Sequence, residues 1–254
     1  MKKMFYSSAA VVAALAFAGP AFASQIDVNT NVNNGEPSLY EIANTPSNGN
    51  GALFADLDAN SPQVNNAHWT GGANGSSNSV LQATWTANYD NATFGVYSIY
   101  DTSIKLNLLY GGSAIGANSD MNTKGFLSYL GNGNFMAYTQ DVSNPVDVTN
   151  VQTENFGSSI FGYFLTIGGN TYYSDSDLNG GEDRMVGYQG DNSGTLLMNE
   201  YLFGWEDGTD NDYQDYVATV ESVRPVPEPS SIAMLGIGLL MIGFAARRLQ
   251  KRDI

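Results

Sequence analysis

The chain has 254 residues, with 25 acidic and 10 basic side chains, one histidine and no cysteine, and its formal net charge is −15. An acidic excess of this size excludes nucleic acid as a partner, because binding to phosphates requires clustered Lys and Arg. The absence of cysteine excludes disulfides, Cys-ligated zinc, iron–sulfur clusters and thiol catalysis, and cations are the natural partners of such a chain.

Residues 1–23 have the three parts of a secretory signal peptide: two lysines near the start, an apolar stretch, and a small-x-small pattern at Ala21-Phe22-Ala23. We expect cleavage after Ala23 and before Ser24, because small residues such as Ala21 and Ala23 mark a cleavage site. The apolar stretch is too short to span a membrane well. The sequence therefore predicts a protein that is exported and loses residues 1–23.

Residues 24–224 form the body, which we predict to be one β-rich extracellular domain. Apolar and polar residues alternate in 104–110, and Tyr, Phe, Gly and Asn are abundant, as in short strands joined by tight turns. We predict an all-β fold, namely a β-sandwich with the jelly roll as one arrangement; the strand order is not readable. The expected strands are 80–87, 93–100, 104–110, 135–139, 160–167, 195–203 and 216–223.

Residues 25–79 give a weaker signal than the rest of the body. They are rich in Asn and Gly and contain one short core-forming stretch, Leu53–Leu57. No apolar period of 3.6 residues predicts a helix here or elsewhere in the body. This part is either the loop-rich edge of a first sheet or a partly disordered arm, and we favour the sheet edge.

The first of two acidic segments, residues 175–183, begins like an EF-hand calcium loop, with the pattern D-x-D-x-N-G. The bidentate acid that closes an EF-hand is replaced by Val186, and the flanks have the pattern of strands rather than helices. The segment is therefore not an EF-hand. It is either a solvated turn or a source of cation ligands, the candidates being Asp175, Asp177, Asn179 and Asp183.

The second acidic segment, residues 206–215, has five carboxylates within ten residues and no Lys or Arg nearby in the sequence. Unpaired carboxylates repel one another and raise one another's pKa values. A Ca²⁺ ion, which accepts about six to eight oxygens, would neutralise them. We predict a calcium site here, on which the 175–183 segment can converge; its ligands are Glu206, Asp207, Asp210, Asp212 and Asp215.

Residues 225–254 form a tail with three parts. Pro227-Glu228-Pro229 is stiff and extended, residues 232–246 are apolar, and a basic end begins with Arg247 and Arg248. The apolar part is slightly shorter than the ~20 residues of a comfortable helical span. The basic end is expected to lie in the cytoplasm, because Lys and Arg next to a membrane span are enriched on that side. The sequence predicts a short transmembrane helix with the body outside.

This tail resembles the PEP-CTERM sorting signal of Gram-negative bacteria, in which a Pro-Glu-Pro tripeptide precedes a short span and a terminal Arg cluster. The resemblance implies recognition by exosortase, a membrane protease-transpeptidase that removes the tail. It also implies that residues 232–246 hold the protein at the inner membrane only transiently. The destination implied is the cell surface or the extracellular polysaccharide matrix.

The second acidic segment carries a further resemblance. Glu206-Asp207 followed by D-x-D-Y-x-D over residues 210–215 is similar to the terminal signature of a β-rich domain of unknown function, common in secreted bacterial proteins. Gln214 stands where that family has Asn, and Arg184 stands where it has His, which removes a histidine ligand or base there. The resemblance implies an extracellular β domain with a calcium site and no known activity. Three other stretches of the chain, residues 93–97, 161–165 and 178–185, are similar to further parts of the same family's sequence pattern.

Three functions are compatible with these features. We favour a non-catalytic exported protein of the cell surface or extracellular matrix, stabilised by calcium, and not an enzyme. A carbohydrate-binding module is the first alternative, because Trp69, Trp85 and Trp205 offer stacking faces, of which Trp205 beside the acidic segment is the best candidate, although each can be a core residue. A glycoside hydrolase is the second, but it needs two carboxylates about 5–10 Å apart across a cleft, and adjacent acids in one loop suit a cation better. We expect the single histidine, His68, to be a surface or packing residue.

Overall fold

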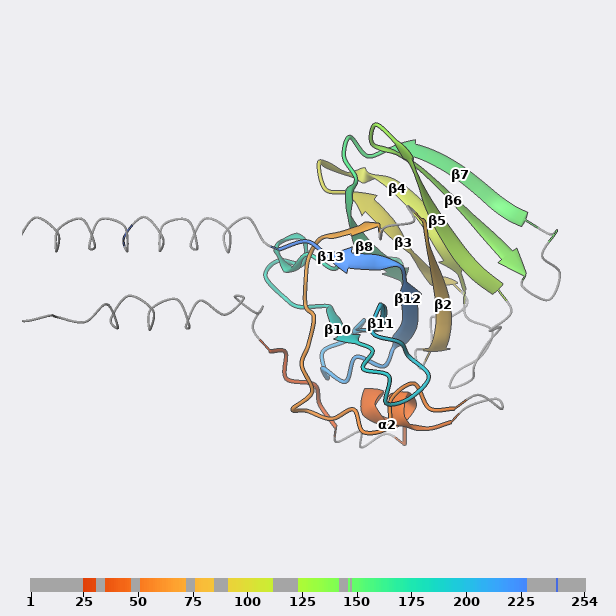
Figure 1. Cartoon of the computed structure of the whole chain (residues 1–254). Coiled ribbons are helices and arrows are strands. Elements are labelled where there is room, and N and C mark those ends of the chain that lie inside the picture. Colours follow the sequence, from red (N-terminus) through yellow and green to blue (C-terminus); the bar gives the residue numbers. More distant parts are fainter. Residues whose placement is uncertain are drawn as a thin grey trace, which may run out of the picture. The chain divides into compact units, whose positions relative to one another are not determined.

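Figure 1 shows the computed structural model of the chain. By their contacts Ser24–Val226 form one compact unit, and the two ends form another. The signal cleavage point (Ala21, Ala23, Ser24) and most of the tail, including Glu228, Pro229, Arg247 and Arg248, lie outside the described residues. Those are 25–30, 35–46, 51–71, 76–84 (in which only the side chain of Ser77 is included), 91–111, 123–141, 146, 148–227 and 241. Among them no helix is both long and apolar enough to cross a membrane.

The described residues form two antiparallel sheets. The six-stranded sheet has the order β13-β1-β8-β3-β4, with β9 also paired to β8, and the seven-stranded sheet has the order β10-β11-β12-β2-β5-β6-β7. The strands are β1 Trp69–Gly71, β2 Ser76–Thr84, β3 Thr93–Ser98, β4 Asp101–Tyr110, β5 Thr123–Gly131, β6 Asn134–Asp141, β7 Val148–Asn155, β8 Ile160–Ile167, β9 Asn170–Tyr173, β10 Met185–Gln189, β11 Glu200–Trp205, β12 Tyr216–Glu221 and β13 Val223–Pro225.

Buried aromatic side chains between the two sheets form the main hydrophobic core. The ring of Trp69 in the six-stranded sheet lies 5.0 Å from those of Tyr201 and Phe203 in the seven-stranded sheet, measured between centroids. Phe94 and Trp205 make a similar contact at 6.2 Å. The sheets therefore pack face to face, and the predicted β-sandwich is confirmed. The jelly roll stays a prediction, because three consecutive neighbouring strands such as β5, β6 and β7 also occur in a Greek key.

Several predicted strands are confirmed, namely those that correspond to β3, β4, β6, β8 and β12. The strand expected at 195–203 begins only at Glu200, because Leu196 lies in a loop and packs into a second core cluster. The sequence does not predict β7 or β10. Strand β7 is exposed over nearly its whole length and β10 is buried on both faces, so neither shows the alternation on which the prediction depends.

The segment that precedes β1 covers the outer face of β10, β11 and β12. Leu39, Ala43 and Phe54 are buried there against Leu202 and Val217, which point away from the main core. Residues 25–79 are not a disordered arm where the structure describes them. They include β1, and Val64 donates its N–H to the carbonyl of Gly187 in the edge strand β10 at 2.8 Å, so the sheet edge that we favoured is confirmed in part. The segment before β1 also buries a sheet face that would otherwise be exposed to water.

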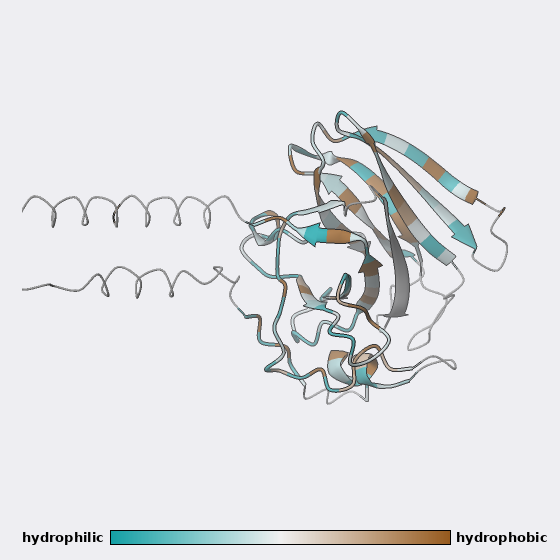
Figure 2. Cartoon of the chain, viewed as in Figure 1, coloured by the Kyte–Doolittle hydropathy of each residue, from teal (hydrophilic) through white to brown (hydrophobic). Residues whose placement is uncertain are grey.

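A short helix, α2 (Leu39–Asn44), is the main contact of this segment, and the sequence does not predict it. Ser38 caps it, with its hydroxyl accepting the N–H of Glu41 at 3.2 Å. The spacing Ser38-x-x-Glu41 is that of a capping box, a local signal for a helix start. In Figure 2 the helix carries both hydrophobic and hydrophilic residues, as expected for a helix with one buried face.

Candidate metal centre

The acidic segment 206–215 is the loop between β11 and β12, and sheet pairing fixes both of its ends. Trp205 and Tyr216 are direct cross-strand partners, and both side chains are fully buried in the main core. Because the loop leaves and re-enters the sheet at neighbouring positions, its ten residues fold back on themselves. This closure, rather than the acidic residues, brings the carboxylates together.

Three carboxylates of this loop meet at one point. Glu206, Asp210 and Asp212 each offer an oxygen, and these oxygens all lie within 4.8 Å of one another. Glu206 is fully buried and Asp212 is 1% exposed, whereas Asp210 is exposed. The cluster is therefore closed on the protein side and open to solvent at Asp210. Burying carboxylates in this way is costly unless the charge is compensated.

The backbone of the loop adopts two left-handed residues around Asp212. Asn211 has a φ of 60° and Tyr213 a φ of 56°, a conformation that Asn tolerates but that costs a bulky residue roughly 1–2 kcal/mol. The surroundings hold Tyr213 there, because its ring is buried in the second core cluster and its hydroxyl donates to the carbonyl of Asp183 at 2.9 Å. Backbone strain of this kind is concentrated at functional sites.

Hydrogen bonds from the loop itself satisfy part of the acidic cluster. Glu206 Oε1 accepts the N–H of Gly208 at 2.7 Å, and Asp215 Oδ2 accepts that of Asp207 at 2.6 Å. The side-chain amide of Gln214 donates at 2.9 Å to Asp212. Its oxygen, Gln214 Oε1, is buried and accepts no hydrogen bond from the residues that the structure describes. A buried acceptor without a donor is costly.

Burial raises the pKa values of these acids. Burial, together with the charge of Asp210, raises the pKa of Glu206 to about 7. Burial also raises the pKa of Asp215 to about 8, and that of Asp212 above its usual range. At neutral pH the cluster therefore resists carrying its full negative charge, and a bound cation would relieve that resistance.

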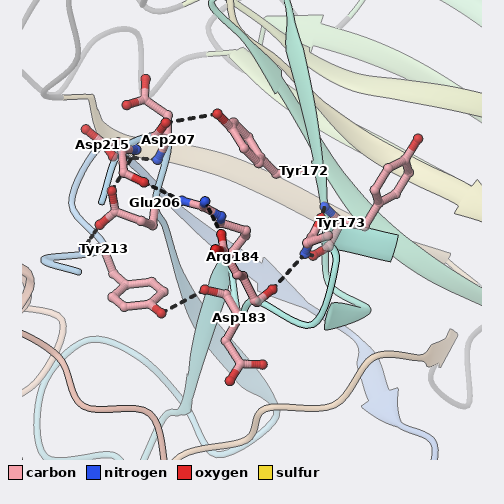
Figure 3. A network of polar contacts seen from close by, with 11 residues as sticks. Tyr172, Tyr173, Asp183, Arg184, Glu206, Asp207, Tyr213 and Asp215 are labelled. Atoms are coloured by element: carbon pink, nitrogen blue, oxygen red, sulfur yellow. Dashed lines mark hydrogen bonds and ion pairs between the residues drawn. The ribbon is translucent and has the colours of Figure 1, made fainter. Parts of the chain in front are cut away.

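Arg184 lies close to the acidic loop in the fold, although it is distant from that loop in the sequence. Pairing of β10 with β11 brings it beside the loop, where its guanidinium donates to the carbonyl of Gly208 and lies 5.3 Å from the ring centre of Tyr172. Figure 3 shows Arg184 and Tyr172 directed at the loop, with the Tyr172 hydroxyl donating to the carbonyl of Asp207 at 2.9 Å. The ion pair of Arg184 is with Glu182, not with the three clustered carboxylates. Arg184 thus holds the loop backbone without neutralising the cluster.

The acidic residues of 175–183 do not join this group in the part of the chain that the structure describes. Asp175 caps a short 3-10 helix (Ser176–Asn179) by accepting the N–H of Asp177, and it lies 3.6 Å from His68. Asn179 is hydrogen-bonded in both directions to the backbone of Tyr173. Asp183 is linked to the cluster only through its carbonyl, which accepts the hydroxyl of Tyr213. His68 has an acidic partner, which its sequence neighbours do not reveal.

The two tryptophans with described side chains are core residues, the alternative that the sequence left open for each. Trp69 and Trp205 are both fully buried in the main core, so neither can present a face to a ligand, and Trp205 is not the stacking residue of a carbohydrate site. The side chain of Trp85 lies outside the described residues. Tyr100, which is 73% exposed, and Tyr110, which is 46% exposed, are the large aromatic residues on the described surface.

Comparisons with known proteins identify one segment of the chain. Residues 225–249 match the family model of the PEP-CTERM protein-sorting motif, so the sorting motif expected from the sequence is confirmed, and this motif indicates an exported protein. The similarity of residues 80–223 to a second family stays a prediction. No curated protein matches the chain.

Three bacterial lectins of known structure show a weak likeness to the chain. They are the high-affinity mannose-binding lectin of Ralstonia solanacearum (20% identity, 63% of this chain and 96% of the lectin covered, TM-score 0.26), the C-terminal domain of the BC2L-C lectin of Burkholderia cenocepacia (13%, 63% and 97%, TM-score 0.28) and the Chromobacterium violaceum lectin CV2L in complex with α-methyl-fucoside (15%, 63% and 97%, TM-score 0.28). With TM-scores this low, the likeness gives no information about ligands.

Proposed function

We propose that this exported protein is a non-catalytic component of the cell surface or extracellular matrix, whose body is stabilised by a Ca²⁺ ion bound at the loop between β11 and β12. The observation that carries the proposal is the meeting of Glu206, Asp210 and Asp212, two of them buried, with oxygens within 4.8 Å of one another. The ion would compensate the charge that the fold has withdrawn from water.

The donor set of the cluster suits a hard cation. Its side chains offer only oxygens, which favours Ca²⁺ or Mg²⁺ over zinc or copper. Ca²⁺ accepts about six to eight oxygens in variable geometry, whereas Mg²⁺ demands near-octahedral geometry and keeps much of its water. Gln214 Oε1, which has no hydrogen-bond partner, is an additional neutral oxygen of the kind that Ca²⁺ accepts. Asp207 and Asp215 lie beside the cluster and add negative charge.

The non-catalytic part of the proposal rests on how the acids are placed. A glycoside hydrolase holds its two carboxyl groups about 5–10 Å apart, with the substrate between them. Here the clustered oxygens are closer together, and Glu206 accepts a backbone N–H of its own loop. This arrangement is typical of cation binding rather than of acid–base catalysis.

The test is the melting temperature of the full-length chain, purified in mild detergent, in chelator and in millimolar Ca²⁺. Ca²⁺ at about 100 times its Kd adds about 2.7 kcal/mol to the free energy of unfolding, which is roughly 5–10 °C for a domain of this size. The matched variants are Asp210→Asn in the cluster and Asp177→Asn in the other acidic segment. Both residues are exposed, so neither substitution disturbs the core.

We expect Asp210→Asn to abolish most of the response to Ca²⁺ and to make the metal-free chain slightly more stable than before, because one repulsive charge is gone. Asp177→Asn should respond like the unaltered chain. Equal melting temperatures of the unaltered chain with and without Ca²⁺ would contradict the calcium site. A response to Mg²⁺ of the same size would mean that the site does not select Ca²⁺.

Carbohydrate binding is the second candidate, and an exposed tyrosine favours it. Tyr100 is 73% exposed, and its ring lies beside Gly157, whose added Cβ would meet it at 3.4 Å. Gly157 thus lies beside the ring without a side chain of its own to cover it, and an exposed flat ring of this kind can stack on a sugar. Affinity electrophoresis in the polysaccharide of the producing strain tests this, with Tyr100→Ala expected to abolish retardation. Equal mobility with and without polysaccharide would exclude the candidate.

A further inference from the structure

The sorting motif begins inside the folded body. The matched segment starts at residue 225, and Pro225 is the last residue of β13, where it pairs with Trp69 of β1. Val226 then donates its N–H to the carbonyl of His68 at 2.9 Å, and its own carbonyl accepts from Asn66 Nδ2 at 3.3 Å. Backbone contacts with the body thus continue up to the residue before the Pro-Glu-Pro tripeptide.

The prolines of the motif determine which edge of the strand can still donate hydrogen bonds. Val226 uses the backbone edge that faces β1, and successive residues of a strand present their N–H groups to opposite edges. Pro225 therefore faces the outer edge, and Pro227 and Pro229 follow at the same spacing in the sequence. Proline has no N–H. If the motif is extended, its prolines leave the outer edge without N–H donors. All of its N–H donors then lie on the opposite edge, which at Val226 is hydrogen-bonded to the residue before β1.

A protease that binds this motif needs those same backbone groups. Extended peptides are bound largely through main-chain hydrogen bonds, as if they were an added strand. Strand β13 ends its sheet, so its outer edge has no strand partner in the described part of the chain. The residues that face this outer edge in the motif are prolines. Proline is tolerated there because it has no N–H that would need a strand partner. The enzyme and β1 therefore compete for one side of the motif.

We propose that the exosortase-type enzyme takes the motif by the backbone edge that β1 holds, so that β13 has to separate from β1 before the tail is removed. Removal of the tail breaks one peptide bond. Its acyl carbon is transferred to water or to an amine, and the leaving nitrogen takes up a proton and becomes the amino terminus of the released tail. This inference goes beyond the calcium site and does not depend on it.

The test joins β13 to β1 covalently. Thr70 and Arg224 are direct partners in the two strands, and such partners have Cα atoms about 4.5–5.5 Å apart, within the ~4.4–6.8 Å of disulfides. The chain has no other cysteine, so the variant carrying Thr70→Cys and Arg224→Cys has one pairing. It is expressed at full length in a host that removes the tail from the unaltered chain. Gel mobility and mass then show disulfide formation and tail removal.

We expect the oxidised variant to retain its tail, with removal slowed at least about tenfold, and reduction to restore the normal rate. Each single-cysteine variant should be processed normally. A matched disulfide between β5 and β6, made by Lys124→Cys and Gln140→Cys, stiffens the body away from β13. Tail removal at the unaltered rate from the oxidised β1–β13 variant overturns the proposal, and so does equal slowing by the β5–β6 disulfide.

A second variant weakens the contact instead of locking it. Asn66→Ala removes the side-chain donor to the carbonyl of Val226 but keeps the Asn66 carbonyl, which accepts the indole N–H of Trp69 at 2.9 Å. Loss of one such hydrogen bond should make separation, and hence tail removal, about three- to fivefold faster. An unchanged or slower rate contradicts the proposal.

Discussion

The two acidic loops of this protein have similar compositions but different positions in the fold. The loop at 206–215 joins two paired strands of one sheet, and its Glu206 and Asp212 are buried. The segment at 175–183 joins β9 of one sheet to β10 of the other, and its Asp177, Glu182 and Asp183 are exposed. The first gathers three carboxylates within 4.8 Å, and the second turns its polar groups onto its own backbone.

This difference shows that the density of acidic residues does not by itself create a site. What matters is whether the chain must close on itself and whether other segments then cover it. At 206–215 the N-terminal segment does so, because Asn29 donates its backbone N–H to the carbonyl of Asn211 at 2.8 Å and Glu36 accepts from Gln214 at 2.9 Å. Water is kept from Glu206 and Asp212, although not from Asp210, and the two buried charges then need a partner.

The largest single loss of stability should come from adding a methyl group to the glycine beneath the buried loop, for which a glycine of the other loop is the comparison. A Cβ at Gly204, beneath the buried loop, would collide with the carbonyl of Tyr213 and meet Leu39 at 2.8 Å, whereas Gly180 has open space but a φ of 75°. We expect Gly204→Ala to lower the free energy of unfolding by about 3 kcal/mol and Gly180→Ala by about 1 kcal/mol. Chemical denaturation measures both. Equal losses would show that the two loops are packed alike.

The effect of Ca²⁺ on stability, which is slightly smaller than that single loss, should also distinguish the loops. Asp212→Asn should remove most of the gain of about 2.7 kcal/mol that Ca²⁺ gives at 100 times its Kd, because Asp212 is one of the three clustered carboxylates. Asp175→Asn in the other loop should leave that gain unchanged. Calorimetric titration of the full-length chain measures both affinities. Loss of Ca²⁺ binding in Asp175→Asn would indicate that the ion binds at residues 175–183 and would contradict the site proposed at 206–215.

The pH dependence of the metal-free chain should follow the buried loop. The folded-state pKa values of Glu206 and Asp215, about 7 and about 8, lie above their unfolded values. The folded state therefore binds these two protons more tightly, so the stability that they contribute is complete below pH ~4 and is lost as the pH rises to about 8. Thermal melts in chelator between pH 4 and pH 8 test this. Ca²⁺ should reverse the loss at pH 8 and have little effect at pH 4.

The smallest effect should come from a hydrogen bond that joins the N-terminal segment to the buried loop. Asn29 Nδ2 donates to the carbonyl of Asp210 at 3.1 Å, so Asn29→Ala should cost about 1 kcal/mol and speed proteolysis of the N-terminal segment. Gln25→Ala is a matched control, because that exposed side chain donates to Ala59 and not to the loop. If both variants are cleaved alike, the loop does not hold the segment.

The sequence predicts what depends on neighbouring residues. Alternation gives β4, a short apolar run before a Gly-Gly-Asn turn gives β8, and the acids of 206–215 are visible directly. Contacts between distant residues are not predictable in this way. Arg184 reaches the acidic loop only through strand pairing, and Asp175 reaches His68 only across the fold. For the same reason the sequence does not distinguish the buried Trp205 from an exposed stacking residue.

The contact between the N-terminal segment and the buried loop determines how late in synthesis the folding of the body can finish. Asn29 and Asp210 are 181 residues apart, and a ribosome adds about 5–20 residues per second. Roughly 10–40 s therefore pass between the synthesis of α2 and that of the strands it covers. During that time Leu39 and Phe54 have no final partner, and the body can close only after nearly all of it has been made. Slow closure from long-range contacts makes such a protein dependent on protection while it is incomplete.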